Sequence, residues 1–490
     1  MPKSLITFVS ILVVAVFLVQ CRKEKFITDT GAMLELSADT LLFDTVFTTI
    51  GSTTQVLKLY NRHNESIRIS SIELQGGSGS QFRMAVDGIN GTYFEDVEIL
   101  ANDSIYAFVE VTVDPGGVEL PFVIEDNIHI ITNGNEQVVN LAAWGQDAYF
   151  HGGLGGLFVL GCADIWTNDK PHVVYGIVAV DSACTLTILQ GTQVHVHSKS
   201  GMYVYKGVLN VEGQLGEEVV FQGDRLEPEF ANVPGQWGIQ LDFLVETGFG
   251  TEVATITRGG IWLFESTGSV IDYAILKNGT IGIQADTTGA TGNEYALVLR
   301  NTKIQNMSAI GLWAQGSEIA GYNNLIVNCG QACGAFTIGG RYTIDHTTFA
   351  NYWSEGTRTA PAFVLTDYYE DIFQNIQLRP LEEATFRNCI MWGNNATLND
   401  FSEFVIDLAE EVDDQSYFFE RCIVDTELDV DPVDHWLDMR VAPPMFIDPA
   451  ALNFLPSGTP SQMTLGPNFS TSDLAGVSWE EVVVGCYTNN

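Results

Sequence analysis

The sequence predicts an all-β chain in two parts, a β-sandwich over residues 33–148 and a stacked parallel β-helix over residues 164–465. Six similar steps predict the β-helix, five of which pair an apolar residue with a polar one two positions on: Leu276-Lys277-Asn278, Ile304-Gln305-Asn306, Ile326-Val327-Asn328, Phe349-Ala350-Asn351, Ile390-Met391-Trp392 and Ile423-Val424-Asp425. The first three intervals, 278 to 306, 306 to 328 and 328 to 351, are 28, 22 and 23 residues. Such a period is typical of a solenoid. Short alternating runs between turn signals predict the sandwich.

Residues 1–20 are expected to be a leader and no part of the fold. The apolar run from Leu5 to Val19 is about 15 residues long, short of the roughly 20 that a membrane-spanning helix needs. Cys21 ends this run, which resembles the lipobox of bacterial lipoproteins, although Gln20 replaces the usual small residue. The resemblance implies a lipid on Cys21, an outer-membrane anchor in the cell envelope, and a tether over residues 21–32. The alternative is an uncleaved anchor in which this cysteine has no role.

The first domain is predicted from period-2 segments such as 56–60, 66–70 and 106–113, which Gly-, Asn- and Pro-containing turns separate. Several short strands at this spacing indicate a β-sandwich of immunoglobulin type. The order of Phe43-Asp44-Thr45-Val46, Val111-Thr112-Val113-Asp114-Pro115 and Trp144-Gly145 resembles the ASH-type and PapD-like modules of bacterial surface proteins. In that family the module is a spacer or interaction domain, so no site is carried over.

Residues 149–163, rich in glycine, are predicted to link the sandwich to the β-helix. In the β-helix, equivalent positions of successive coils lie above one another. The asparagine side chains can therefore pass amide hydrogen bonds along the stack and satisfy polar groups at a corner. We expect Asn278, Asn306, Asn328 and Asn351 to form this structural ladder.

Two later intervals are longer, and their insertions, Thr366–Glu383 and Asn399–Ser416, are rich in acidic and aromatic residues. Insertions in solenoids form loops on one flank, where such folds commonly bind ligands, although solvated acidic loops are the simpler explanation. Residues 466–490 are predicted as a C-terminal tail.

Charge and cysteine content limit the function classes. The formal net charge of −39 disfavours nucleic acid as a partner. Calcium could bind so acidic a surface, but no EF-hand loop or Gly-Asp nonapeptide repeat is present, so no cofactor is predicted. Cys389 and Cys422 occupy the same ladder position, so they could bond or lie reduced in the core, and Cys329 and Cys333 could bridge a loop.

Two groups of residues are candidates for ligand contacts. Asp224 and Arg225, beside a turn that carries Gln236 and Trp237, offer an acid, a cation and an aromatic face for a sugar ring; the alternative is a salt bridge beside a packed tryptophan. His195 and His197 share one face of a strand and are weak candidates for a metal, because no third ligand is evident. No residue is singled out as catalytic.

A family resemblance covers nearly the whole mature chain. The ladder from Ile271 to Asp425 resembles right-handed parallel β-helix proteins of the pectin-lyase-like type. Residues 221–227, 233–239 and 143–148 resemble segments of β-helix lipoproteins of Bacteroidetes, which are named by fold. The resemblance implies a membrane-anchored module that binds or scaffolds envelope glycans or proteins. The alternative is a carbohydrate-active enzyme, a lyase or a hydrolase, acting on the β-helix flank.

Overall fold

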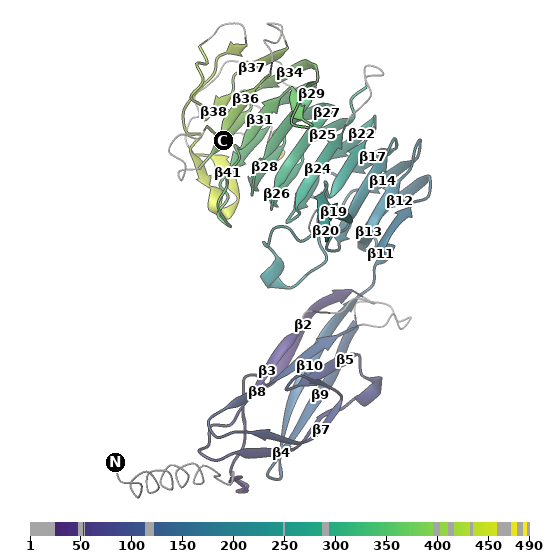
Figure 1. Ribbon diagram of the computed structural model, residues 1–490, viewed down its shortest axis with the longest axis vertical. Coiled ribbons are helices and arrows are strands. Elements are labelled where there is room, and N and C mark those ends of the chain that lie inside the picture. The colour runs from purple at the N-terminus through teal and green to yellow at the C-terminus, as the bar shows by residue number, and fades with distance from the viewer. Residues whose placement is uncertain are drawn as a thin grey trace, which may run out of the picture. The chain divides into compact units, whose positions relative to one another are not determined.

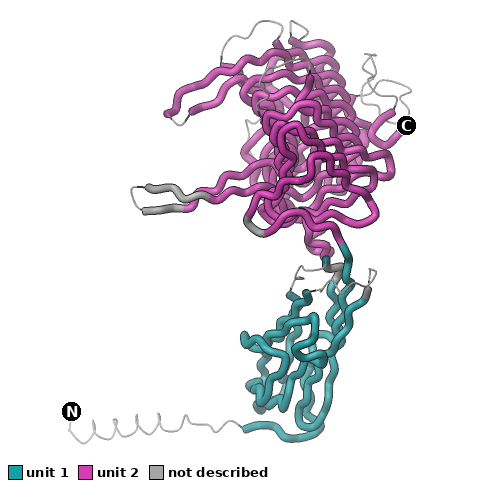
Figure 2. The backbone as a smooth tube through the Cα atoms, turned by 90° about the vertical axis from the view of Figure 1, so that its right-hand side faces the viewer, with its two compact units in different colours: residues 1–147 teal, residues 148–490 magenta. Residues whose placement is uncertain are grey.

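The computed structural model describes residues 25–47, 52, 54–112, 122–247, 250–286, 294–371, 373–394, 402–409, 416–431, 435–457, 472–477 and 484–487. The predicted leader and Cys21 lie outside these residues. The chain is all-β and divides into two compact units, residues 1–147 and 148–490 (Figure 2). Across the described ranges, no helix is long and apolar enough to cross a membrane.

The first unit is a sandwich of two five-stranded sheets around one apolar core. Alternation along the strands produces this core: in β8, Ile105, Ala107 and Val109 are buried while the residues between them face outward. One sheet has the order β1 (Glu35–Leu36), β3 (Gln55–Tyr60), β8 (Ser104–Val111), β5 (Phe82–Val86), β6 (Ile89–Asn90); the other has β2 (Thr40–Phe47), β10 (Asn135–Gln146), β9 (Phe122–Thr132), β4 (Ile67–Leu74), β7 (Tyr93–Ile99). The finer assignment to the immunoglobulin type stays a prediction.

Residues 25–32, predicted as part of a tether, instead pack against the sandwich. The backbone N–H of Ile27 donates to the Ser66 carbonyl over 2.9 Å, and Ala32 is buried in the core. The guanidinium of Arg68 lies 4.4 Å from the ring centre of Phe26. The apolar side chains of this segment explain the difference, because burial on the sandwich removes them from water.

The second unit is a parallel β-helix, in which strands of successive coils pair in register and form three columns (Figure 1). The first column contains β11 (Tyr149–Val159), β13 (His172–Val180), β15 (Gln193–Val196), β18 (Val219–Gly223), β23 (Ala274–Lys277), β26 (Lys303–Met307), β28 (Leu325–Cys329), β30 (Thr348–Asn351), β35 (Ile390–Gly393) and β38 (Ile423–Val424).

The second column shares β11 and β13 with the first and then adds β16 (Gly201–Tyr205), β21 (Ile261–Phe264), β24 (Ile281–Asp286), β27 (Ile310–Tyr322), β29 (Gly334–Asp345), β31 (Phe363–Thr366) and β36 (Phe404–Asp407). The third column shares β27 and β29 and otherwise contains β12 (Ala163–Trp166), β14 (Thr185–Leu189), β17 (Val208–Glu212), β22 (Ser269–Asp272), β25 (Leu297–Arg300), β34 (Leu381–Arg387), β37 (Tyr417–Glu420) and β39 (Trp436–Leu437). The handedness of the coil stays a prediction.

The inward side chains of the three columns form one continuous core. Because the coils are in register, like residues stack: Phe386 pairs with Phe419, with ring centres 4.8 Å apart, and Phe363 pairs with Phe404 at 5.3 Å. Such aromatic stacks add to the stabilisation that burial gives.

In the described part of the second unit, three hairpins lie outside the columns. They are β19 (Gln240–Thr247) with β20 (Gly250–Thr257), β32 (Tyr368–Glu370) with β33 (Ile376–Leu378), and β40 (Phe446–Asp448) with β41 (Asn453–Pro456). The first hairpin precedes a second-column strand along the chain, and the β32–β33 hairpin follows one. The outer face of the second column therefore lies between the points from which they project.

The register agrees with the first four predicted ladder steps and corrects the fifth. Leu276, Ile304, Ile326 and Phe349 pair in succession across β23, β26, β28 and β30. Phe349 then pairs with Met391, and Asn351 pairs with Gly393, so the predicted fifth step is one residue out of register. A Cβ on Gly393 would lie 2.1 Å from Oε1 of Glu403, so a side chain at that step would have to displace this carboxylate, which is buried and paired with Arg358.

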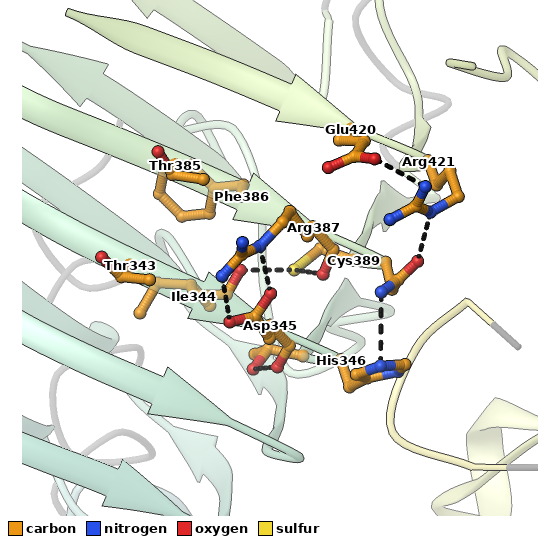
Figure 3. Close-up of polar contacts among 12 residues, drawn as sticks. Thr343, Ile344, Asp345, His346, Thr385, Phe386, Arg387, Cys389, Glu420 and Arg421 are labelled. Carbon is orange, nitrogen blue, oxygen red and sulfur yellow. Dashed lines mark hydrogen bonds and ion pairs between the residues drawn. The ribbon is translucent and has the colours of Figure 1, made fainter. Parts of the chain in front are cut away.

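A second polar column, which the sequence did not reveal, lies at the turn from the third column to the first. Asn301, Asn323, His346, Asn388 and Arg421 are all buried there, each with φ between 46° and 62°. Asn323 Nδ2 donates to Asn301 Oδ1 over 2.7 Å, and Arg421 Nε donates to Asn388 Oδ1 over 3.1 Å. Figure 3 shows the contacts from His346 to Arg421. These bonds satisfy part of the polar groups at this buried corner.

The glycine-rich segment is a strand, although it was predicted to be a linker. Residues 149–159 form β11 and pair with β13, with a register shift between Gly152 and Leu157. Gly152 has a φ of 90°, and a Cβ there would lie 2.1 Å from the Tyr175 carbonyl oxygen, so only glycine fits. The same region contains a disulfide, Cys162–Cys184, that joins adjacent coils and was not predicted.

The predicted insertions and tail have mixed structures. The first insertion forms the β32–β33 hairpin, whereas the second contains β36, a strand of the second column, so it is not solely a loop. Glu410–Asp414 lies outside the described residues. Among the described residues, the last strand that pairs in the three columns is β39, whereas the β-helix was predicted to extend to residue 465. Beyond it, Leu474, Val484 and Cys486 pack on the outer face of the first column.

Cys329, Cys333, Cys389, Cys422 and Cys486 are free and buried.

Candidate functional site

The outer face of the second column carries a cluster of four aromatic side chains, Tyr203 and Tyr205 from β16 and Trp262 and Phe264 from β21, which we call the aromatic platform. Alternation turns these residues outward, and the parallel register places Tyr203 beside Trp262 and Tyr205 beside Phe264. The ring centres of Tyr203 and Trp262 are 4.7 Å apart, and those of Tyr205 and Phe264 are 6.2 Å apart. All four side chains are partly exposed. The face therefore presents a continuous aromatic surface.

The next coil continues the same rows with polar side chains. Trp262 pairs with Gln284, and Phe264 pairs with Asp286. Trp262 Nε1 donates to Asp286 Oδ2 over 2.8 Å, and Gln284 Nε2 lies 3.0 Å from both carboxylate oxygens of Asp286. Gln284 also donates to Oε1 of Gln315, on the following coil, over 3.0 Å. A connected amide and carboxylate network thus borders the platform.

Asp286 is the titratable residue of this network. It is 9% exposed, and burial raises the pKa of its carboxyl group above the ordinary value. The hydrogen bonds from Trp262 and Gln284 and the charge of Arg258 act in the opposite direction on that pKa, and burial prevails. The guanidinium of Arg258 lies 5.4 Å from the Trp262 ring centre. Asp286 is therefore a carboxyl group that holds its proton more strongly than a solvated aspartate.

A cleft of about 540 Å³, which we call the platform cleft, opens beside Asp286. It lies at the turn from the second column to the third, with the β32–β33 hairpin on one side. Arg379 Nη2 donates to the Tyr369 hydroxyl over 3.1 Å, and Arg341 forms an ion pair with Glu318. The lining residues are Asp286, Gln315, Gly316, Glu318, Ile338, Gly340, Arg341, Tyr369, Arg379, Pro380 and Glu382. The cleft combines three carboxyl groups, two guanidinium groups and a tyrosine.

The residues predicted for sugar binding do not line the platform cleft, and each of them has a separate partner. Asp224 accepts a hydrogen bond from His197 Nδ1 over 2.6 Å, while Arg225 pairs with Glu227. Trp237 is 1% exposed and donates from Nε1 to the Lys277 carbonyl, so its ring is in the core. Gln236 donates to the carbonyls of Phe230 and Val233 and so braces its own loop. The buried Trp237 ring offers no face to a ligand here, and a sugar contact with Asp224, Arg225 or Gln236 stays a prediction.

The two candidate metal-binding histidines have separate partners. His195 is buried, with Nδ1 3.3 Å from the Gly223 carbonyl oxygen, and His197 stacks on Tyr175 at 4.4 Å. Among the described residues, no group of three or more His, Cys, Asp or Glu side chains is placed to hold a metal ion.

The ladder asparagines have different partners along the stack. Asn306 Nδ2 donates to Asn278 Oδ1 over 2.7 Å, so these two form a ladder contact. Asn328 Oδ1 instead accepts from the Tyr352 backbone N–H over 3.2 Å. Asn351 is fully buried and bonds to the backbone N–H and carbonyl of Cys329.

Sequence reasoning missed the platform and its network, although a signal was present. Tyr203 and Tyr205 alternate with Met202 and Val204, and Trp262 and Phe264 alternate with Ile261 and Leu263. Successive side chains of a strand point to opposite faces, so aromatic residues that alternate with buried apolar ones lie on the outer face. The interval from Gly213 to Ile261 hides the equivalence of the two runs, because the β19–β20 hairpin lies within it.

Comparisons with known proteins give distant likenesses only. Neither a protein-family model nor a curated protein matches the sequence. Among solved structures, a family 123 glycoside hydrolase from Clostridium perfringens is 7% identical over 26% of each chain, with a TM-score of 0.17. The periplasmic chaperone SfaE is 13% identical over 23% of this chain and 57% of its own, with a TM-score of 0.16. The catalytic unit of a GH87 α-1,3-glucanase from Streptomyces thermodiastaticus strain HF3-3 is 11% identical over 75% of this chain and 72% of its own, with a TM-score of 0.30.

Proposed function

We propose that the second unit binds glycans on the outer face of its second column, with the aromatic platform and the platform cleft as the contact surface. The apolar faces of sugar rings pack on aromatic rings, and sugar hydroxyls exchange hydrogen bonds with amides and carboxylates. The observation that carries the proposal is the contact between the two kinds of group, Trp262 with Asp286 over 2.8 Å. The cleft volume of about 540 Å³ lies within the roughly 300–1,000 Å³ of ligand sites.

The test is binding of the full chain to a panel of soluble and insoluble polysaccharides. Trp262→Ala removes the central ring and should weaken binding about tenfold or more, since a stacked ring contributes roughly 1–3 kcal/mol in comparable contacts. Phe108→Ala is the matched control, because Phe108 is an exposed aromatic residue on a sheet face of the first unit. Equal binding by wild type and Trp262→Ala would exclude the platform as the contact surface.

A second candidate is hydrolysis of a glycosidic bond in the platform cleft. The raised pKa of Asp286 suits a general acid, and Glu318 and Glu382 line the same cleft as candidate partners. The measurement is release of reducing ends from the polysaccharide panel. Turnover that Asp286→Asn abolishes, with binding retained, would favour the enzyme; silence across the panel in the wild type would leave binding as the function.

We also propose that this binding takes place outside the cytoplasm, on a lipid anchor at Cys21. Support comes from the disulfide Cys162–Cys184, because disulfides persist in oxidising compartments. Mass spectrometry of the membrane-extracted protein would find a lipid on the N-terminal cysteine. A mature chain that keeps residues 1–20, or lacks the lipid, would contradict the anchor.

A further inference from the structure

A second cleft, of about 270 Å³, lies at the turn from the first column to the second, where the ladder asparagines are. We call it the amide cleft. Asn278, Gln305, Asn306 and Asn328 contribute four amide side chains from three adjacent coils. The described residues that line it are Asn232, Asn278, Gln305, Asn306, Asn328, Tyr352, Trp353, Ser354, Glu355, Ala450, Ala451 and Leu452. The second column separates its edge from the platform cleft.

The ladder of amide hydrogen bonds stops within this cleft. Asn306 uses its Nδ2 group on Asn278 Oδ1 and on the Asn232 carbonyl, both over 2.7 Å. Asn328 accepts at Oδ1 from the Tyr352 backbone. Within the described part of the chain, the Asn306 Oδ1, the Asn328 Nδ2 and the amide of Gln305 make no hydrogen bond to the protein. An acceptor, a donor and a complete amide therefore face the cleft.

The backbone fixes the direction of these amides. Asn278, Asn306 and Asn328 have φ of 64°, 59° and 53°, a left-handed conformation that asparagine tolerates. Because the same turn repeats on each coil, the amides stand at the spacing of parallel strands, about 4.8 Å. That spacing is comparable with the distances between hydroxyl groups around one sugar ring. The donors and acceptors are therefore held in place before a ligand arrives.

Two aromatic side chains and little charge complete the cleft. Tyr352 and Trp353 form the wall and are partly exposed, and the Tyr352 ring is held by Phe446 and Phe454 at 6.1 and 6.0 Å. Glu355 is the single charged residue among the described residues of the lining, and Ser354 donates to it over 3.3 Å. An aromatic wall beside neutral amides suits a ring with hydroxyl groups on its edge and C–H groups on its face.

We propose that the amide cleft is a second binding site, which takes an uncharged sugar unit such as the terminal or branch residue of a glycan. Its volume is just below the roughly 300–1,000 Å³ of sites for drug-sized ligands, in keeping with one sugar unit. Among the described residues that line it there is no cationic side chain, which disfavours uronates and sulfated sugars. This site uses none of the platform residues and does not depend on the function proposed above.

The test titrates the full chain with methyl glycosides of neutral hexoses and N-acetylhexosamines, followed by tryptophan fluorescence and by nuclear magnetic resonance of the side-chain amides. At least one glycoside should saturate the wild type and shift the Asn328 and Gln305 amide signals. Asn328→Asp keeps the shape and the left-handed turn but removes the two N–H donors, and Trp353→Ala removes the wall. Each should weaken that binding by about tenfold, the loss of roughly 1.4 kcal/mol.

Trp262→Ala separates the two sites. It should leave glycoside binding at the amide cleft unchanged, whatever it does to polysaccharide binding. If Trp353→Ala fails to fold, Asn328→Asp and Gln305→Ala carry the test, because Gln305 is partly exposed and makes no bond within the described residues. The proposal is overturned if no glycoside saturates the wild type, if Asn328→Asp binds as the wild type does, or if binding is lost in Trp262→Ala instead.

Discussion

At the residue scale, burial of His195 links stability to pH. Burial lowers the pKa of His195 from 6.5 to about 4, against the opposing influence of Asp224 and the Gly223 carbonyl. The unfolded state then binds the proton more strongly than the folded state. The contribution of neutral His195 to the free energy of unfolding is therefore complete above pH 6.5 and is lost as the pH falls toward 4. The shift corresponds to about 3 kcal/mol. The melting temperature should fall over this range and fall less steeply in His195→Gln; parallel curves would contradict the prediction.

A buried ion pair gives a second residue-scale prediction. The side chains of Arg358 and Glu403 are 4% and 2% exposed, and Glu403 also accepts from the Ala362 N–H over 2.9 Å. Glu403→Gln keeps the shape but leaves a guanidinium buried without its counter-charge. Breaking such a pair costs about 3–5 kcal/mol of unfolding free energy. Denaturant unfolding should show this loss, and Arg358→Met combined with Glu403→Gln should recover part of it; a double variant less stable than Glu403→Gln would oppose this account.

At the element scale, the corner column of polar residues depends on both backbone and side chain. Asn388 has a φ of 53° and bonds to His346 and Arg421. Asn388→Gly keeps the conformation and removes the bonds, at a cost of about 1–3 kcal/mol. Asn388→Ala loses the bonds and also strains the turn by roughly 1–2 kcal/mol more. The melting temperature should therefore be highest for the wild type, lower for Asn388→Gly and lowest for Asn388→Ala. Equal melting temperatures of the two variants would show that strain in the left-handed turn contributes nothing.

The disulfide of the first coils gives a prediction about one end of the β-helix. Cys162 and Cys184 are 22 residues apart. Closing a loop of this length restricts the unfolded chain by about 3 kcal/mol. Cys184→Ser should lower protection of the β12 and β14 amides in hydrogen exchange, while β34 and β37 amides exchange at the wild-type rate. Uniform loss of protection in all four strands would mean that the coils unfold as one unit.

Elements of the fold were predictable to the extent that their periodicity survived in the sequence. Leu276, Ile304 and Ile326 recur at intervals of one coil, and the register agrees with them. The fifth step failed because the strand pairing places Asn351 opposite Gly393, one residue beyond the predicted Trp392. The aromatic platform was not predicted, because the β19–β20 hairpin separates its two strands, β16 and β21, in the sequence. The candidate residues Asp224 and Trp237 lie in neighbouring segments of the sequence, but Asp224 contacts His197 and the Trp237 ring packs in the core.

At the scale of the whole molecule, the two units have separate cores. The sandwich core includes Ile72 and Leu74, the β-helix core includes Leu299 and Leu312, and the two core clusters share no residue. A single domain unfolds in one step because every element depends on one core. We therefore expect two unfolding transitions in the full chain, one for each unit.

Tryptophan content allows the transitions to be assigned. Trp144 is the single tryptophan of residues 1–147, and the other eight of the nine lie in the second unit. In a Trp144→Phe chain, fluorescence should therefore report one transition while circular dichroism reports two. Ile72→Ala should destabilise the first unit and so move the transition that only circular dichroism reports. Leu299→Ala should destabilise the second unit and so move the transition that fluorescence also reports. Each substitution should lower the free energy of unfolding of its unit by about 2–5 kcal/mol. If either substitution moved both transitions equally, the units would unfold as one cooperative body, and ligand binding to the β-helix would then stabilise the sandwich as well.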